Sequence, residues 1–160
     1  MLEYRVTKYD PAYRDARGAF TRDEWTSSSD IGRSFAGVVL TEAEYRRVED
    51  AYAAVAVGFL RDAGVVGLVV TDVERRGDRP LPFAVGAVLG LAEIDTAVRH
   101  LLRDEFWCRL EGEDAFVHVG WDYYMFVGVP RLCPGAEEAA RRLGLFVEPF
   151  ESPYATRKES

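Results

Sequence analysis

The sequence contains few of the residues and motifs on which metal and nucleotide sites depend. Its 160 residues include two histidines and two cysteines, and no Cys-x-x-Cys pair occurs. A structural zinc site takes four Cys or His ligands at close spacing, so none is expected. The motifs GxxxxGK(S/T), GxGxxG and GxSxG are absent, as is the calcium-loop spacing DxDxDG. We therefore expect no metal and no cofactor.

Positive charge is also scarce. The chain has 20 basic and 27 acidic residues, a net charge of −7, and its lysines are Lys8 and Lys158. This charge repels phosphate backbones, so nucleic-acid binding is not expected. It suits a cationic protein partner, because opposite fields speed association. An acidic balance also keeps ordinary proteins soluble, so the charge leaves both interpretations open.

Long apolar runs are missing as well. No segment reaches the roughly 18 apolar residues that a membrane span requires, so no membrane partner is expected. The first residues, MLEYRVTKYD, alternate like a strand and lack the apolar stretch of a secretory leader. We therefore expect a cytoplasmic protein in which Cys108 and Cys133 are free thiols.

Apolar residues make up 48% of the chain and charged residues 29%, as in ordinary globular proteins. The length fits one domain, expected at residues 1–154 with a frayed tail at 155–160. Periodicity predicts strands at residues 2–9, 65–74, 106–111, 115–119, 123–128 and 145–150, and helices at 41–63, 92–105 and 136–143. The late strands and short connections favour an α+β fold: a mostly antiparallel sheet of five to six strands, with two main helices and one short helix on one face. The apolar run at 65–74 indicates a central strand, and Pro149 indicates an edge strand.

The helix at 41–63 has the clearest pattern. Thr41 and Glu44 form a capping-box motif, and Gly64 is placed to end the helix. An apolar stripe repeats at helical spacing: Tyr45, Val48, Tyr52, Val55 and Phe59. The polar positions expected on the opposite, exposed side are Arg46, Glu49, Asp50 and Arg61.

The stretch VGWDYYMFVG (119–128) admits two interpretations. Gly120, Trp121 and Asp122 can form a hairpin loop between two strands, or residues 115–128 can be one long strand with a bulge at Gly120. The hairpin is favoured, because a strand of that length exceeds the usual range. It places Trp121 at an exposed tip.

Residues 10–38 form a long polar stretch in which Asp23, Glu24 and Asp30 surround Trp25. An aromatic residue ringed by carboxylates is one way in which an acidic protein holds a basic partner. Alternatively, Trp25 packs the loop on the sheet while the Asp and Ser side chains make turns. Irregular chain of this length is often functional, so both interpretations are open.

The remaining reactive residues have ordinary explanations. His118, between Val117 and Val119, is expected to be a partly buried histidine; the alternative is a general base near Asp122 or Cys108. His100 is expected on a helix surface. Cys108 is expected to be a small core thiol.

Five stretches of the chain resemble small, acidic bacterial proteins of the toxin-immunity type: YRVTKYDP, DEWTSSSDIG, LTEAEYRRVEDAY, GWDYYMFVG and FVEPFESPY. The resemblance covers nearly the whole chain. It implies a cytoplasmic protein that blocks a toxin by binding it, and it assigns no catalytic residue.

Three functional hypotheses follow. The first is an acidic inhibitor of the immunity type, which binds a cationic protein. The second is a small enzyme that uses His118 with nearby carboxylates, and the third is a non-catalytic regulatory or scaffold subunit. For the first hypothesis the expected partner-binding residues are Asp23, Glu24, Trp25, Asp30, Trp121 and Asp122.

Overall fold

A seven-stranded antiparallel sheet organises the protein, in the order β5-β4-β6-β7-β8-β1-β9. Its strands are β1 (Leu2–Thr7), β4 (Gly67–Arg75), β5 (Val88–Gly90), β6 (Phe106–Glu111), β7 (Phe116–Val119), β8 (Met125–Val129) and β9 (Phe146–Pro149). The computed structural model describes residues 1–156. The expected α+β domain is confirmed, and so is the edge position of β9, the strand that carries Pro149.

The expected count of five to six strands is too low, because the short strand β5 was not predicted. Its three residues lead directly into a helix and are too few to show an alternating pattern. A separate hairpin of β2 (Ser34–Phe35) and β3 (Val38–Val39) was also not predicted. It lies within the polar stretch 10–38, where two-residue strands carry no periodicity.

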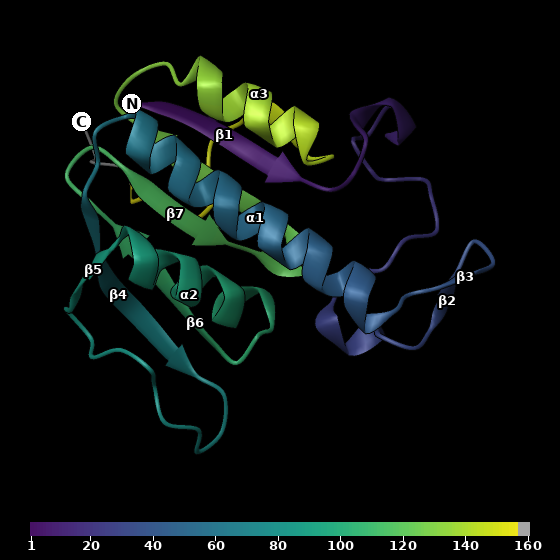
Figure 1. Ribbon diagram of the computed structural model, residues 1–160, viewed down its shortest axis with the longest axis horizontal. Coiled ribbons are helices and arrows are strands. Elements are labelled where there is room, and N and C mark those ends of the chain that lie inside the picture. Colours follow the sequence, from purple (N-terminus) through teal and green to yellow (C-terminus); the bar gives the residue numbers. More distant parts are fainter. Residues whose placement is uncertain (157–160) are drawn as a thin grey trace.

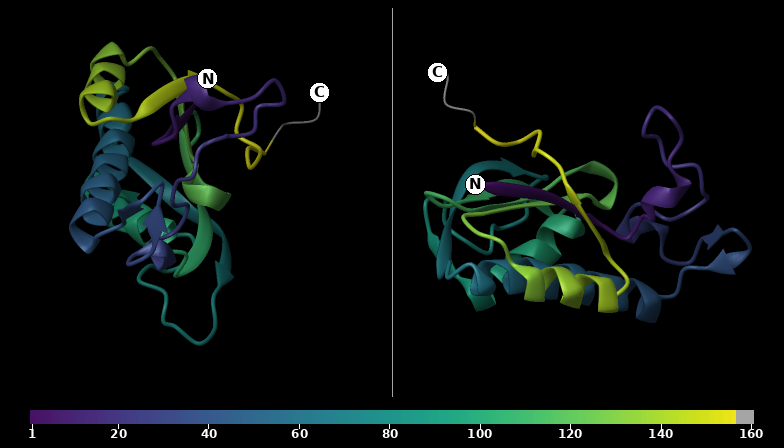
Figure 2. Two further views of the ribbon diagram at one scale, coloured as in Figure 1. Left: turned by 90° about the vertical axis from the view of Figure 1, so that its right-hand side faces the viewer. Right: turned by 90° about the horizontal axis from the view of Figure 1, so that it is seen from above.

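Three helices cover one face of the sheet: α1 (Glu42–Asp62), α2 (Leu91–Leu102) and α3 (Pro134–Arg142). Figure 2 shows them on one side of the sheet, while the chain after β9 runs along the other. Single turns of 3-10 helix occur at η1 (Pro11–Tyr13), η2 (Ser28–Asp30) and η3 (Trp121–Tyr123). Figure 1 shows the β2–β3 hairpin projecting beyond the N-terminal end of α1.

Helix α1 begins and ends as its sequence predicts. The Thr41 hydroxyl accepts a hydrogen bond from the Glu44 backbone N–H at 3.1 Å, which is one half of the expected capping box; the Glu44 carboxylate bonds to Arg47 instead. Gly64 adopts a left-handed φ of +76°, and the next N–H, that of Val65, donates to Leu60 O. The side chains expected to pack on the sheet are all buried: Val48, Tyr52, Val55 and Phe59. The core therefore forms between this helix and the strands.

The expected exposure of Glu49 is wrong. This side chain is only 3% exposed, because α2 packs beside α1 on that side. Its carboxylate accepts a hydrogen bond from Arg103 Nε at 2.8 Å and pairs with Arg99 at 3.6 Å. A buried carboxylate with guanidinium partners is a contact between helices, which periodicity within one helix does not reveal.

The expected central position of the strand at 65–74 is also wrong. Strand β4 is second from one edge, and β7 is the middle strand of the seven. The neighbour of β4 on the outer side, β5, pairs with it only over residues 67–69. The apolar run reflects burial under the helices, since Leu68 and Val70 are 1% and 2% exposed.

The Tyr52 hydroxyl is expected to contribute measurably to stability. It accepts a hydrogen bond from Lys8 N and donates one to Tyr123 O, each at 2.8 Å, in a site with no exposed surface. Tyr52→Phe leaves both backbone groups without this partner, so the free energy of unfolding should fall by about 1–3 kcal/mol. Tyr52→Ala also removes the ring and should cost about 3–5 kcal/mol.

Urea denaturation measures both effects, and Tyr45→Phe is the matched control. The Tyr45 hydroxyl is buried and lies near the Tyr123 hydroxyl and the Glu49 carboxylate, but within residues 1–156 it makes no hydrogen bond of ordinary geometry. Its removal should therefore be nearly neutral. Equal losses for Tyr52→Phe and Tyr45→Phe would contradict the role of the Tyr52 hydroxyl.

Candidate functional site

The turn between β7 and β8 is the most unusual exposed segment of the protein. The hairpin interpretation is confirmed: β7 pairs with β8 from Phe116–Gly128 to Val119–Met125, and residues 120–124 connect them. Trp121 is 76% exposed at its tip. The next two residues have left-handed backbones, with φ of +59° at Asp122 and +66° at Tyr123.

Two tyrosine hydroxyls hold this strained backbone in place. Tyr9 Oη donates to Asp122 O at 2.6 Å, and Tyr52 Oη donates to Tyr123 O at 2.8 Å. The Tyr123 ring is wedged edge-on against Tyr52 and Trp25, with centroid separations of 4.8 and 4.9 Å. A left-handed tyrosine costs about 1–3 kcal/mol and persists only where its surroundings enforce it. The shape of the turn is therefore imposed by the core.

Trp25 lies in that core. It is 8% exposed, and its ring lies 5.5 Å from that of Tyr45 as well as against Tyr123. This is the second of the two interpretations of the loop, in which Trp25 packs the loop on the domain. The sequence expectation of Trp25 as an exposed anchor does not match this burial.

The structure brings the two predicted binding segments together. Besides the contact between Trp25 and Tyr123, the Tyr9 hydroxyl lies 3.4 Å from Trp25 O and bonds to Asp122 O. Tyr9 was missed by the sequence analysis. Its only signal was an apolar position after the first strand, which does not specify a hydroxyl bridging two loops.

The loop carboxylates mostly bond within the loop region. Asp30 Oδ2 accepts from Thr26 N at 3.0 Å, and Asp23 Oδ2 accepts from Ala36 N at 2.8 Å. Arg33 lies 3.6 Å from Asp30, so part of the local negative charge is compensated. Asp23 and Asp30 thus stabilise the conformation of the loop through hydrogen bonds to its backbone.

Glu24 pairs with Lys8 at 3.1 Å. The Lys8 side chain is 7% exposed, and its ammonium lies over the rings of Trp25 and Tyr9 at 4.2 and 4.3 Å. Burial lowers the pKa of Lys8, while the Glu24 carboxylate acts against that shift. The negative charge of Glu24 is thus largely compensated by Lys8.

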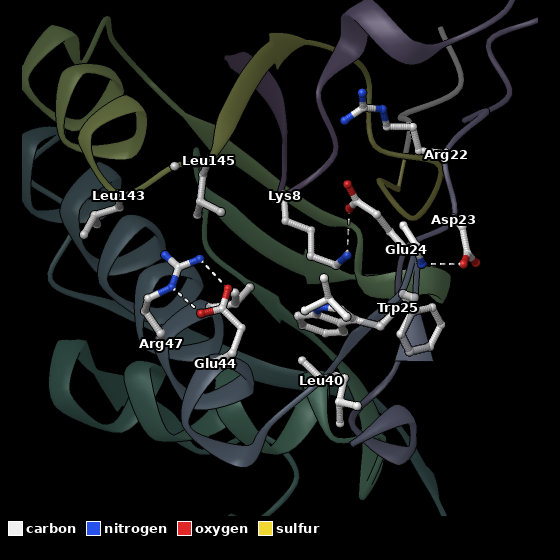
Figure 3. Close-up of a pocket in the computed structure, with 16 residues that line it drawn as sticks. Lys8, Arg22, Asp23, Glu24, Trp25, Leu40, Glu44, Arg47, Leu143 and Leu145 are labelled. Carbon is white, nitrogen blue, oxygen red and sulfur yellow. Dashed lines mark hydrogen bonds and ion pairs between the residues drawn. The ribbon is translucent and has the colours of Figure 1, made fainter. Parts of the chain in front are cut away.

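One cavity, which we call the hairpin cavity, lies between the β2–β3 hairpin and α1 and has a volume of about 650 Å³. Figure 3 shows two ion pairs in its lining, Lys8 with Glu24 and Arg47 with Glu44; Arg22 and Asp23 line it as well, and Asp23 accepts a hydrogen bond from Ala36 N. Its apolar lining is formed by Trp25, Phe35, Val38, Val39, Leu40, Val48, Leu143 and Leu145. Because three cationic and three anionic side chains line it, this cavity offers an apolar surface with little net charge.

A second cavity, which we call the Trp121 groove, opens beside the exposed turn and has a volume of about 540 Å³. Its aromatic lining is formed by Trp107, Trp121, Tyr123 and Tyr154, and its charged lining by Glu74, Arg76, Asp104 and Asp122. Thr26 and Ser27 from the predicted binding loop also line it. Three carboxylates against one guanidinium leave this groove negative. Of the two cavities, the Trp121 groove has the charge that complements a cationic group.

His118 forms a buried chain of polar contacts on the face of the sheet opposite the helices. Its Nε2 lies 2.7 Å from Glu111 Oε1, and its Nδ1 lies 2.7 Å from Ser152 Oγ. The histidine has no exposed surface, Ser152 is 1% exposed, and the ring stacks on Phe116 at 4.1 Å. A serine, a histidine and a carboxylate in contact are groups of the kind used for nucleophilic catalysis, but here the serine is covered.

The same contacts hold the C-terminal segment (residues 150–156) on the sheet. Ser152 N donates to Glu3 Oε1 at 3.3 Å, and Arg109 Nη1 donates to Tyr154 O at 2.8 Å and to Thr156 Oγ1 at 2.7 Å. Of the tail expected at 155–160, residues 157–160 lie outside the described part of the chain. The histidine is thus fully buried, where partial burial was expected, and it anchors this segment.

The two cysteines are buried free thiols, as expected. Burial raises the pKa of Cys108 to about 12, which suppresses the nucleophilic thiolate. His100 is half-exposed on α2, as expected, and contacts Glu105. Neither residue lies at the exposed turn.

Comparisons with protein-family models, with curated proteins and with solved structures each give no match. Within residues 1–156, no group of three or more His, Cys, Asp or Glu side chains could hold a metal ion. Nor does any helix in that part of the chain combine the length and apolarity needed to cross a membrane.

The buried tyrosines around the turn should make the protein sensitive to alkali. Burial raises the pKa of Tyr9, Tyr45, Tyr52 and Tyr123 above the usual value of about 10. The folded state therefore holds these protons while the unfolded state loses them. Their contribution to stability is complete below about pH 10 and should be lost as the pH rises above it.

Denaturation midpoints between about pH 9 and pH 12, with the absorbance of ionised tyrosine, measure this loss. Cys108 acts in the same direction, and Lys8, whose pKa burial lowers, acts in the opposite direction. Tyrosines that all titrate near the usual value in the folded protein would contradict the burial of the cluster.

Ser152→Ala should loosen the C-terminal segment. The variant removes the Ser152 hydroxyl, which lies beside His118 Nδ1. The same hydroxyl accepts a hydrogen bond from Tyr154 N at 3.2 Å. Amide exchange at Tyr154 should accelerate, and the free energy of unfolding should fall by about 1–3 kcal/mol. Ser29→Ala, at an exposed hydroxyl, is the control. Unchanged exchange at Tyr154 in the Ser152 variant would argue against this anchor.

Proposed function

We propose that the protein is an acidic inhibitor of the immunity type, which neutralises a cationic protein toxin by binding it. The observation that carries the proposal is Trp121, an aromatic side chain 76% exposed on a strained turn whose backbone is bonded to buried tyrosines of the core. Tryptophans presented on rigid backbone are frequent hot spots of protein interfaces. Strained backbone also tends to occur at functional sites, where it fixes a side chain for binding.

The charge of the protein supports a cationic partner. The chain carries a net charge of −7, and the carboxylate of Asp122 is adjacent to Trp121 and exposed. Such a field raises the rate of encounter with a basic surface and is screened by salt. In this arrangement the carboxylate steers the partner, while the tryptophan provides the contact from which water is removed.

The six expected binding residues have different roles in this proposal. Trp121 and Asp122 form the direct contact. Asp23, Glu24 and Asp30 shape the loop, and two of them are paired with cations, Glu24 with Lys8 and Asp30 with Arg33. Trp25 supports the turn from beneath through Tyr123. The site we propose is thus centred on the turn, and the loop lies at its border.

The inhibitor would act in the cytoplasm. Its two cysteines, Cys108 and Cys133, are free and buried, a state that a reducing compartment preserves. A toxin delivered into the same compartment would meet it there.

A catalytic function of His118 is the second candidate. It is favoured by the contacts of this histidine with Glu111 and Ser152. Ser152 belongs to the C-terminal segment and is 1% exposed, so substrate could reach it beside His118 only through a local opening that keeps the two residues together. Hydrolysis of ester or peptide substrates, lost in a folded His118→Ala variant, would support this function over the first.

The proposed inhibition is tested by capturing partners from a lysate of the native cell, identifying a basic protein, and measuring its binding. Trp121→Ala should weaken binding by about 2 kcal/mol or more, roughly thirtyfold. Asp122→Asn keeps the left-handed backbone, which Asn tolerates, and should lower the association rate and its dependence on salt. Inhibition of the partner's activity should weaken in parallel with binding.

Leu132→Ala is the matched control, because Leu132 is 71% exposed and follows the opposite end of β8. Circular dichroism checks that every variant is folded. If Trp121→Ala and Leu132→Ala both bind as tightly as the parent protein, the contact lies elsewhere. If the captured protein retains its activity when bound, the inhibitor proposal fails.

A further inference from the structure

The Trp121 groove is lined by more than the exposed turn. Its opening is formed by residues from separate parts of the chain: the turn η3, the end of β4, the end of α2 and the C-terminal segment. Its volume of about 540 Å³ is within the range of ligand pockets. It can therefore receive a side chain with part of the backbone that carries it.

Contacts with the rest of the domain orient two of the aromatic rings that line the groove, Trp107 and Tyr154. Trp107 Nε1 donates to Val119 O at 2.8 Å, which sets the plane of the indole. Tyr154 lies against it with ring centroids 5.5 Å apart, and Arg109 holds the Tyr154 backbone. The backbone after Trp121 is bonded to Tyr9 and Tyr52, while the Trp121 side chain itself is 76% exposed. Faces of Trp and Tyr attract a cation, most strongly where water is excluded.

The charges around the groove have the same preference. Arg76 lies 3.3 Å from Asp104 and 3.5 Å from Glu74, so a guanidinium is already accommodated at the border of the groove. Asp122 makes no side-chain hydrogen bond or ion pair with the rest of residues 1–156. After Arg76 is counted, the groove still has an excess of negative charge. A second guanidinium would compensate it.

We propose that this groove receives an arginine side chain of the partner protein. A guanidinium can stack on the indole planes and bond to a carboxylate with two parallel N–H groups, which an ammonium cannot do. The guanidinium lies among Trp107, Trp121 and Tyr154 and pairs with Asp122. This inference rests on the proposed function for its partner, but the chemistry of the groove can be tested without one.

The test uses N-acetyl-arginine amide as the probe and N-acetyl-citrulline amide as its uncharged control. The chain has three tryptophans, so three indole N–H signals in an NMR titration report on three places. Arginine amide should shift the signals of Trp107 and Trp121 and leave that of Trp25, in the core, unchanged. The dissociation constant of so small a probe is expected in the millimolar range, about 4 kcal/mol of binding free energy. Citrulline amide should produce no comparable shift.

The variants sharpen the test. Trp121→Ala and Asp122→Asn should each weaken arginine amide binding by about fivefold, read from Trp107, and Leu132→Ala should leave it unchanged. Equal binding of citrulline amide, equal binding of N-acetyl-lysine amide, or shifts at Trp25 alone would each overturn the arginine assignment.

The outcomes separate this inference from the proposed function. If a basic protein is inhibited through Trp121 while arginine amide leaves the groove signals unchanged, the proposed function is retained and the arginine assignment fails. If arginine amide binds as described but no basic protein is inhibited, the groove assignment is retained and the inhibitor function fails.

Discussion

The buried hydroxyl of Tyr52 connects the three parts of the chain on which the candidate site depends. From helix α1 it accepts a hydrogen bond from the end of β1, at Lys8, and donates one to the turn η3, at Tyr123. The first contact aligns the sheet with the helix above it. The second fixes a backbone conformation that a tyrosine does not adopt unaided. Packing and site geometry are therefore coupled through one side chain.

Coupling of this kind explains why the exposed surface can be rigid although it is a loop. Beneath the turn, the rings of Trp25, Tyr45 and Tyr52 surround that of Tyr123, and the Tyr9 ring packs against Tyr124. Aromatic pairs in edge-on geometry stabilise their mutual orientation as well as burying area. A rigid loop loses less conformational entropy on binding than a mobile one. In the proposed function, the core would thus contribute to recognition without touching the partner.

The fold was predictable where local pattern decides it. The stripe from Tyr45 to Phe59, the Thr41 cap and Gly64 define α1 within its own sequence. Alternation defines β6, and two apolar runs separated by turn residues define the hairpin of β7 and β8. Features set by distant neighbours were not predictable. The burial of Glu49 depends on α2, and the strand β5 depends on pairing with β4. Neither leaves a periodic signal.

The site was predictable in part for the same reason. Trp121 and Asp122 stand out because Gly, Trp and Asp are adjacent at a turn. The loop carboxylates stand out equally in sequence, yet Asp23 and Asp30 bond to backbone N–H groups that only the folded loop brings near. Net charge is a property of the whole chain, whereas binding depends on which carboxylates remain uncompensated.

At the turn, the residues that support the fold differ from the residues that are exposed, and this affects how the sequence of such a protein can change. Buried tyrosine hydroxyls hold the turn through hydrogen bonds to its backbone. The fold therefore does not depend on the side chain at position 121. Position 122 needs a residue that tolerates a left-handed backbone, which leaves Asp, Asn and Gly as favourable choices. If these residues bind a partner as proposed, one substitution at either position would change the binding preference while the domain beneath keeps its structure.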